Sequence, residues 1–337
     1  MLSSSLTTSI AVFVAAGIVS LSASLLLVAR IERAGTSLGL SDAFIGLVAA
    51  FCADAPEVSS SITAIARHQS TVGVGVVFGS NIFNLAALLG LAAVVAGRVS
   101  IHHRAAILEG SVGTAVAVVA ALSAFRVLPL GAALALSGSL LAGYSALVAL
   151  RPTAMQRLRI PPRAAVWLAL AVREEALDAS EASPRRERGR RAAPDFALAI
   201  LALAVVVAAS ILMEMSGTSL GAHFRLPEIV TGGVLIAAIT SLPNAVAALY
   251  LSSRNRGAAV MAEAMNSNAF NILAGFLIPA VAVNLTVSSF ASVSALWYLL
   301  MTGAVAGAVV ACRGLGRGAG AAVIAAYVGF LVLLVTR

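Results

Sequence analysis

Hydrophobic runs long enough to cross a bilayer recur along the whole chain, separated by short polar stretches. An α-helix needs about 20 mostly apolar residues to span the hydrocarbon core. Helices also satisfy their own backbone hydrogen bonds, which lipid cannot do. We therefore predict an all-α polytopic membrane protein with ten transmembrane helices. The predicted spans are residues 7–29, 41–66, 71–97, 105–125, 127–150, 194–215, 226–252, 257–283, 288–312 and 316–336.

Composition excludes a soluble domain. The mean hydropathy is +1.01, and only 11% of the residues are charged, whereas about a quarter are charged in an average soluble protein. The two cysteines, Cys52 and Cys312, lie in or at the end of predicted spans. We therefore expect neither a disulfide framework nor a thiolate metal site.

The net charge of +8 comes from arginines that gather in alternate loops. Four of the 22 basic residues lie outside the loops that follow the first, third, fifth, seventh and ninth spans. Those loops therefore hold the other 22 − 4 = 18. The positive-inside rule makes those loops cytoplasmic and both termini extracytoplasmic, in a multi-pass protein of the plasma (inner) membrane. The charge thus reflects membrane topology, and we expect lipid rather than nucleic acid as a partner. The four remaining arginines are Arg67, Arg126, Arg225 and Arg337.

A basic segment, residues 151–193, divides the spans into a first group of five (1–150) and a second group of five (194–337). Its stretch "EEALDASEASPRRERGRRAAP" is charged and turn-rich, which predicts a flexible cytoplasmic linker. The preceding "AAVWLALAV" (164–172) is apolar but too short to span. We expect it to form a helix that lies on the anionic inner leaflet.

The two groups of spans contain related stretches. A shift of 187 residues matches residues 54–85 to 241–272 at six positions without a gap, and it sets "SNIFN" (80–84) against "SNAFN" (267–271). We infer an internal duplication. Because each copy has an odd number of spans, the second must be inverted relative to the first. Inverted five-helix repeats are an architecture of secondary transporters, whose sites lie at the membrane midplane.

Prolines are predicted to break one helix in each repeat. Proline has no N–H, and its ring clashes with the carbonyl four residues back, so Pro56 and Pro243 interrupt the second and seventh spans at matching positions. Freed carbonyls are tolerated at membrane depth only where they pack in protein or face a cavity, and there a cation can satisfy them. The carbonyls released beside the two breaks belong to Cys52, Ala53, Ile239 and Thr240.

Oxygen-bearing side chains gather around these breaks. Asp54 and Glu57 are three residues apart and share one helix face. Carboxylate, hydroxyl, amide and carbonyl oxygens without histidine or cysteine suit hard cations such as Na⁺, Ca²⁺ and Mg²⁺. The other members of this predicted cation site come from the second break and from the third and eighth spans: Thr240, Ser241, Asn244, Ser80, Asn84, Ser267 and Asn271.

The motifs "CADAPEV" and "GSNIFN" (within 51–85) and "ITSLPNAV" and "NSNAFNIL" (within 238–272) resemble the two α-repeats of the calcium/cation antiporter superfamily. Its best-known branch is the sodium/calcium exchangers. The resemblance implies an antiporter rather than an enzyme, without a cofactor, that exchanges Ca²⁺ or a related cation for Na⁺ by alternating access. The ion ligands that it implies are Glu57, Ser80, Asn84, Ser241, Ser267 and the carbonyls of Ala53 and Thr240.

The acids are distributed differently from the usual pattern of that family. Asp54 stands where serine is usual, Asn244 replaces the usual glutamate, and Asn271 occupies a position that is acidic in many members. The first repeat thus carries two acids in its motifs and the second carries none. A further acid, Glu263, precedes Ser267 by four residues on nearly the same helix face and is a candidate ligand.

These residues also have structural interpretations. Asp54 could cap the broken helix by accepting backbone N–H groups, and the asparagines could bond between helices. Glu263 could pair with an arginine at the cytoplasmic interface. Glu109 and Glu214 lie near span ends, from which we expect them to reach lipid headgroups.

Other functions fit the pattern less well than Na⁺-coupled antiport. A proton-coupled Ca²⁺/cation exchanger is the alternative within transport, because carboxylates with neutral amide partners can titrate. A cation channel usually has a ring of equivalent sites. An intramembrane hydrolase needs a nucleophile with a base or a pair of aspartates, but all four histidines lie in loops or near span ends and Asp54 has no aspartate near it.

Overall fold

The computed structural model describes residues 6–38, 40, 42–149, 161–182, 192–253, 257–286 and 289–336. In the first half the elements are α1 (Leu6–Ser37), α2 (Asp42–Ala53), α3 (Ala55–Ala66), α4 (Ser70–Asn84), the π-helix η1 (Leu85–Leu91), α5 (Ala92–Ala96), β1 (Arg98–Ser100), α6 (His103–Ala124) and α7 (Leu130–Ala149). Helix α9 (Pro162–Ala182) follows. The second half contains α10 (Ala192–His223), α11 (Glu228–Val230), η2 (Thr231–Ile236), α12 (Ala237–Thr240), α13 (Leu242–Ser253), α14 (Gly257–Phe270), η3 (Asn271–Leu277), α15 (Ile278–Ala282), α16 (Ser289–Cys312), β2 (Gly314–Gly316) and α17 (Arg317–Thr336).

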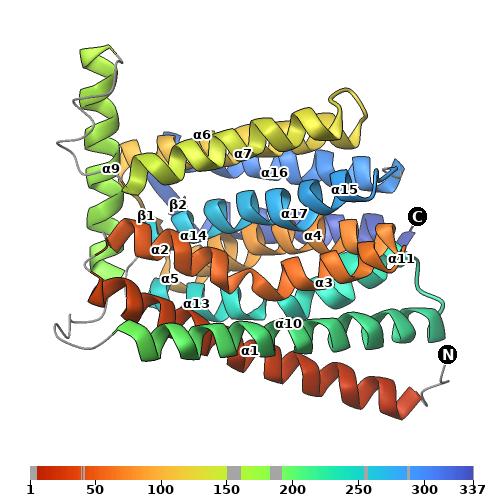
Figure 1. Ribbon diagram of the computed structural model, residues 1–337. Coiled ribbons are helices and arrows are strands. Elements are labelled where there is room, and N and C mark those ends of the chain that lie inside the picture. The colour runs from red at the N-terminus through yellow and green to blue at the C-terminus, as the bar shows by residue number, and fades with distance from the viewer. Residues whose placement is uncertain are drawn as a thin grey trace.

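The long helices lie side by side in one bundle, and both chain ends lie at the end of the bundle away from α9 (Figure 1). Within the described ranges, eight helices are long and apolar enough to cross a membrane. The other two predicted spans, 41–66 and 226–252, are each divided into shorter helices. Eight continuous and two broken segments account for the ten predicted crossings.

Both breaks fall where the prolines predict them. Helix α2 ends at Ala53 and α3 begins at Ala55, with Pro56 in the first turn of α3, where the missing N–H is not needed. The chain continues through the break without a loop, because the Val58 amide still donates to the Asp54 carbonyl at 3.0 Å. In the second repeat the corresponding break lies at Ser241, between α12 and α13.

The sequence patterns did not predict the π-helical turns. The π-helix η1 starts directly after Asn84, and η3 starts at its repeat equivalent, Asn271. Such turns occur mostly inside α-helices and often at functional sites. Apolar periodicity cannot reveal them, because one extra residue in a continuous apolar run leaves the run apolar.

A two-stranded ribbon joins the two halves at the α9 end of the bundle (Figure 1). Strand β1 pairs antiparallel with β2, with Val99 opposite Leu315. The sequence patterns predicted no strand between the spans, so the ribbon was not predicted. Gly314 has a φ of +138°, and a Cβ there would collide with the Val99 carbonyl, so only glycine suits this position.

Helix α9, which contains the 164–172 segment, lies across the end of the bundle rather than along it (Figure 1). The expectation of a flexible linker from Glu174 onward is wrong as far as Ala182, because the helix continues to that residue. Good helix-forming residues in "EEALDASEA" outweigh its charge. The remaining linker residues, 151–160 and 183–191, lie outside the described ranges.

Glu174 attaches α9 to the start of α6. It accepts hydrogen bonds from the Arg104 side chain at 2.7 Å and from the backbone amides of Arg104 and Ala105. Partial burial alone would raise the pKa of the Glu174 carboxyl, but these hydrogen bonds outweigh it and hold the pKa below its usual range. Glu174 thus supplies a side-chain cap to α6 from a separate helix.

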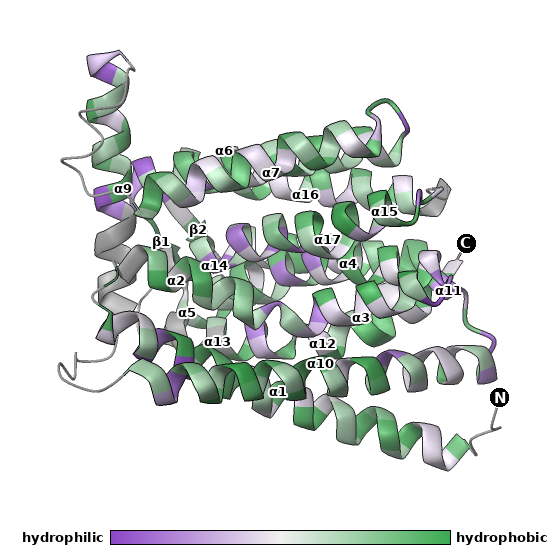
Figure 2. Cartoon of the chain, in the orientation of Figure 1, coloured by the Kyte–Doolittle hydropathy of each residue, from purple (hydrophilic) through white to green (hydrophobic). Residues whose placement is uncertain are grey.

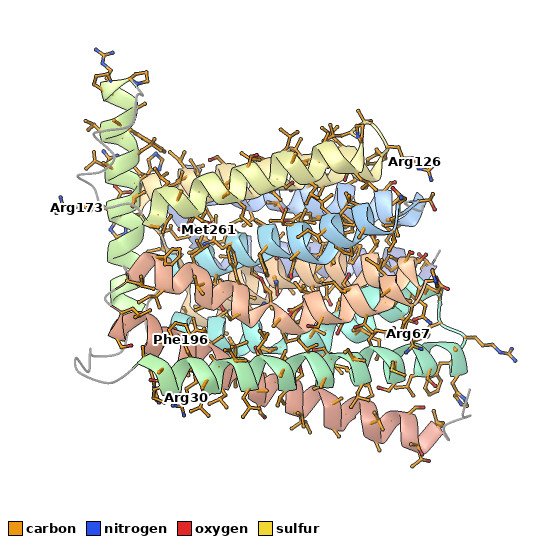
Figure 3. The ribbon with its side chains drawn as sticks, in the orientation of Figure 1. Arg30, Arg67, Arg126, Arg173, Phe196 and Met261 are labelled. Carbon is orange, nitrogen blue, oxygen red and sulfur yellow. The ribbon has the colours of Figure 1, made fainter. Side chains whose placement is uncertain are left out.

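Arginines lie at opposite ends of the bundle in the way the loop count predicts. Figure 3 shows Arg30 and Arg173 at the α9 end, and Arg67 and Arg126 at the end that carries the termini. The helices between these ends consist mostly of hydrophobic residues (Figure 2).

Candidate functional site

Polar residues lie in the middle of the otherwise hydrophobic bundle, among the broken helices and α4 and α14 (Figure 2). The fold brings ten of the eleven predicted site residues into this region, and all ten are buried. They are Ala53, Asp54, Glu57, Ser80, Asn84, Thr240, Ser241, Asn244, Ser267 and Asn271.

The carboxylates of the first repeat face residues of the second. Asp54 Oδ1 accepts hydrogen bonds from Asn244 Nδ2 at 3.0 Å and from Ser267 Oγ. The same Asn244 nitrogen lies 3.5 Å from Glu57 Oε1. One amide nitrogen, that of Asn244, therefore lies between the two acids. Both acids stand beside the break at Pro56.

Helix α4 completes the contact between the repeats. Asn84 Nδ2 donates to Ser267 Oγ at 3.2 Å, and the hydroxyls of Ser80 and Thr240 lie 3.5 Å apart. Asn271 Nδ2 donates to Asn81 Oδ1 at 3.2 Å. The interhelical hydrogen bonding considered for the asparagines is thus present.

A reciprocal asparagine pair holds α4 against α14. Asn81 Nδ2 donates to the Asn268 carbonyl, and Asn268 Nδ2 donates to the Asn81 carbonyl, both at 3.0 Å. The two residues are repeat equivalents and make the same contact in opposite directions, as the inverted repeat requires. We did not select them from the sequence, although their identity between "SNIFN" and "SNAFN" was the available signal.

Buried oxygen atoms without a hydrogen-bond partner remain at the centre of the site. They come from both repeats and include carboxylate and amide oxygens: Asp54 Oδ2, Glu57 Oε2, Asn84 Oδ1 and Asn244 Oδ1. Unpaired buried oxygens are costly, and a cation ligated by them would offset that cost. Carboxylate and amide oxygens are hard ligands, so this donor set fits a hard cation.

Glu263 lies on α14 and is only partly buried. One of its carboxylate oxygens is buried without a hydrogen-bond partner. The arginines considered as its partners, Arg254 and Arg256, lie outside the described residues. The expectation that Glu109 and Glu214 reach headgroups is wrong, because both side chains are buried within the bundle.

Comparison with known families identifies the protein. The sequence profile described as "Sodium/calcium exchanger protein" matches residues 8–151 and 195–336, which include both halves of the bundle and omit the linker. The chain belongs to the sodium/calcium exchanger family. It is therefore a transmembrane protein of an ion-exchanger family rather than an enzyme in the catalytic sense. No curated protein sequence matches the chain.

Three solved structures share this fold. The sodium-calcium exchanger NCX_Mj, soaked with 2.5 mM Na⁺ and 10 mM Sr²⁺, has a TM-score of 0.63 at 19% identity, covering 97% of this chain and 99% of that one. The H⁺/Ca²⁺ exchanger CAX has a TM-score of 0.68 at 17% identity, covering 96% and 82%. Native YfkE has a TM-score of 0.59 at 17% identity, covering 98% and 100%. At this identity the likeness supports the shared helical fold with inverted repeats.

Proposed function

We propose that this family member exchanges Ca²⁺, or a related divalent cation, for Na⁺ at the site between its two broken helices. The observation that carries the proposal is the set of unpaired buried oxygens on Asp54, Glu57, Asn84 and Asn244. Two carboxylates with neutral amide and hydroxyl neighbours match the hard-oxygen coordination of Ca²⁺ and Na⁺.

The proposed ligands come from both repeats. Asp54 and Glu57 supply the charge, and a bound cation would replace the hydrogen bonds that Asn244 and Ser267 now donate to Asp54. The remaining ligands follow from their burial around the two breaks and from the family resemblance: Ser80, Asn84, Ser241, Asn271 and the carbonyls of Ala53 and Thr240. Glu263, which is only partly buried, is a further candidate.

Alternating access follows from the position of the site between the halves (1–150 and 194–337). Each repeat contributes one broken helix and one intact helix that meet at the same place. A movement of one part of the bundle against another could then open the site first to one side of the membrane and then to the other. The ion would stay bound between the same residues during this movement.

A proton-coupled exchange of Ca²⁺ is the second candidate. Asp54 and Glu57 are both fully buried and share one amide donor, so two protons could neutralise them as well as two Na⁺ ions. The similar structures include one described as a sodium-calcium exchanger and one described as an H⁺/Ca²⁺ exchanger. These relatives make both coupling ions reasonable.

Uptake of radiolabelled Ca²⁺ into proteoliposomes tests the proposal. The purified protein is assayed under an outward Na⁺ gradient, under a pH gradient and with neither. Na⁺-driven uptake is expected, and uptake driven only by the pH gradient would favour proton coupling. No uptake under either gradient would contradict Ca²⁺ exchange.

We also propose a location in the plasma (inner) membrane, with both termini extracytoplasmic and the 151–193 segment cytoplasmic. The support is the arginine count, together with the positions of α9 and the termini at opposite ends of the bundle (Figure 1). Positively charged loops are retained on the cytoplasmic side.

A further inference from the structure

Ser61 lies on α3 between two glycines that belong to different repeats. Its side chain is fully buried. The hydroxyl lies 2.9 Å from the Gly73 carbonyl oxygen on α4 and 2.8 Å from the Gly275 carbonyl oxygen on η3. Glu57 precedes Ser61 by four residues and so lies one turn away on the same face of α3. One hydroxyl thus contacts both repeats beside the half-helix that carries Glu57.

The two glycines allow the close approach that these contacts need. A Cβ added to Gly73 would lie 2.8 Å from the Ser61 carbonyl oxygen, and one added to Gly275 would lie 2.9 Å from Val77 Cγ2. Small residues let membrane helices pack with their backbones close together. Side chains at these positions would push α4 and η3 apart from their neighbours and lengthen the contacts of the Ser61 hydroxyl.

The contact with η3 leads directly to the cation site. Gly275 lies inside η3, which begins at the candidate ligand Asn271. A π-helical turn contains one extra residue within an α-helix, and this changes the direction in which the following carbonyls point. Ser61 therefore connects α3 to the same turn of the second repeat that begins at Asn271.

The second repeat has the same packing without the hydroxyl. The shift of 187 residues places Ser61 on Ala248, a fully buried residue of α13, and relates Gly275 to Leu88 in η1. Helix α13 packs against η1, although the methyl group of Ala248 cannot donate a hydrogen bond. The helix architecture therefore does not require a serine here. The hydroxyl is found only in the repeat whose half-helix carries the acid.

We propose that Ser61 is a positioning residue whose hydroxyl holds the α3 half-helix against η3 and thereby fixes Glu57 relative to the ligands of the second repeat. A hydroxyl has one hydrogen, so it can pass from the Gly275 carbonyl to the Gly73 carbonyl without losing its partner. Selectivity among hard cations depends on cavity size and on the flexibility of the ligands. Ser61 therefore sets the discrimination between cations of different radius. This role rests on the proposed cation site.

Ser61→Ala and Ser61→Cys test the role together. Cysteine fills the place of serine, but its S–H group is a weak donor, so the pair separates hydrogen bonding from packing. Competition of Sr²⁺ with radiolabelled Ca²⁺ during uptake measures the selectivity. Both variants should lower the preference for Ca²⁺ over Sr²⁺ by about fivefold, because a less rigid Glu57 adapts to the larger ion. The parent selectivity in Ser61→Cys would assign the effect to packing and overturn the proposal.

Ser60→Ala is the matched control. Ser60 is the adjacent residue and is also fully buried, but its hydroxyl donates to the Ser210 carbonyl on α10 at 3.4 Å and not to η3. This variant should keep the parent preference for Ca²⁺ over Sr²⁺. An equal loss of selectivity in Ser60→Ala would overturn the assignment to the Ser61 hydroxyl.

Hydrogen–deuterium exchange of the cation-free protein tests the contact independently of transport. In Ser61→Ala and Ser61→Cys, the amides of α3 should exchange about tenfold faster than in the parent, with those of α13 unchanged. Faster exchange throughout the chain would indicate general destabilisation and overturn the proposal. An unchanged rate in α3 would also overturn it.

The two measurements let the positioning role and the proposed function fail separately. Local loosening of α3 in a protein whose parent form takes up no Ca²⁺ would retain the contact and reject the ion assignment. Ca²⁺ exchange by the parent with unchanged selectivity in both Ser61 variants would retain the function and reject the positioning role.

Discussion

Asp54 and Glu57 are two buried acids with different surroundings. Asp54 accepts close hydrogen bonds from Asn244 and Ser267, whereas the Asn244 amide lies farther from Glu57 Oε1, at 3.5 Å. Both keep one oxygen without a partner. Glu57 is therefore the acid that a bound cation would stabilise most, and Asp54 both binds the cation and positions its neighbours.

We expect Glu57→Gln to abolish exchange while folded protein remains in the membrane. Glutamine keeps the shape of the side chain but removes half of the negative charge that would balance a divalent cation. Exchange in proteoliposomes and gel filtration of the purified protein measure the two effects. Glu228→Gln, at an exposed acid, is the control that should leave exchange unchanged. Exchange by Glu57→Gln at the parent rate would remove the centre of the proposed site.

Asp54→Ser should weaken Ca²⁺ binding by about tenfold or more, which corresponds to about 1.4 kcal/mol. The substitution restores the residue usual in the family but removes one of two carboxylates from the centre. The apparent Ca²⁺ affinity is measured by uptake at a series of Ca²⁺ concentrations, with Asp54→Asn as the variant of similar size. An unchanged affinity would mean that Asp54 only positions Asn244 and Ser267.

At the scale of elements, close backbone contact sets the position of the helices around the site. Helix α4 packs against η2, where a Cβ added to Gly79 would collide with the backbone of Gly233. Small residues allow such contacts between membrane helices. The contact lies next to Ser80, so it also sets how far this hydroxyl lies from Thr240.

Gly79→Ala should therefore lower the thermal stability of the purified protein and slow exchange. The added methyl group must push α4 away from η2, because the opposing atoms are backbone and cannot move aside. Gly143→Ala is the matched control, since nothing lies within 4 Å of a Cβ at that position. The thermal unfolding of the two variants is measured in the same detergent, and their exchange is measured in proteoliposomes. Equal stability of the two variants would contradict this account of the contact.

At the scale of the whole molecule, the charge of the site limits what it can carry. Two buried carboxylates balance one Ca²⁺, two Na⁺ or two protons, and a large imbalance would be costly in a buried site. We therefore expect one divalent cation to exchange for two monovalent cations without net charge movement. In liposomes with potassium and valinomycin, the exchange rate should not depend on voltage. A steep voltage dependence would indicate a third monovalent ion, with Glu263 as its ligand.

The arrangement of the bundle in the membrane is tested by labelling from outside the cell. In a background without native cysteines, Ser183→Cys should resist an impermeant thiol reagent, because we expect residues 151–193 to be cytoplasmic. Ser183 itself lies outside the described residues. The control is Val127→Cys, at an exposed turn beside Arg126 at the opposite end, which should be labelled. Labelling of Ser183→Cys with Val127→Cys protected would invert the topology.

The sequence alone determined the spans, the repeat and the position of both broken helices. These features follow from local rules: apolar length sets a span, a proline removes a specific hydrogen bond, and an odd number of spans inverts the second copy. The residues Asp54, Glu57, Ser80 and Asn244 could be selected because polar groups at membrane depth stand out against an apolar background. The same reasoning selected Glu263, which the fold leaves only partly buried on α14.

Only the tertiary structure decided which polar groups meet. The bonds between Asp54 and Asn244, and between Asn81 and Asn268, join residues 190 and 187 positions apart, and no local pattern contains the distance between them. The same holds for the β1–β2 ribbon and for the full burial of Glu214, which depends on α1 and α3 covering one face of α10. Sequence periodicity shows which face of a helix is polar, but only packing decides whether that face meets lipid, water or another helix.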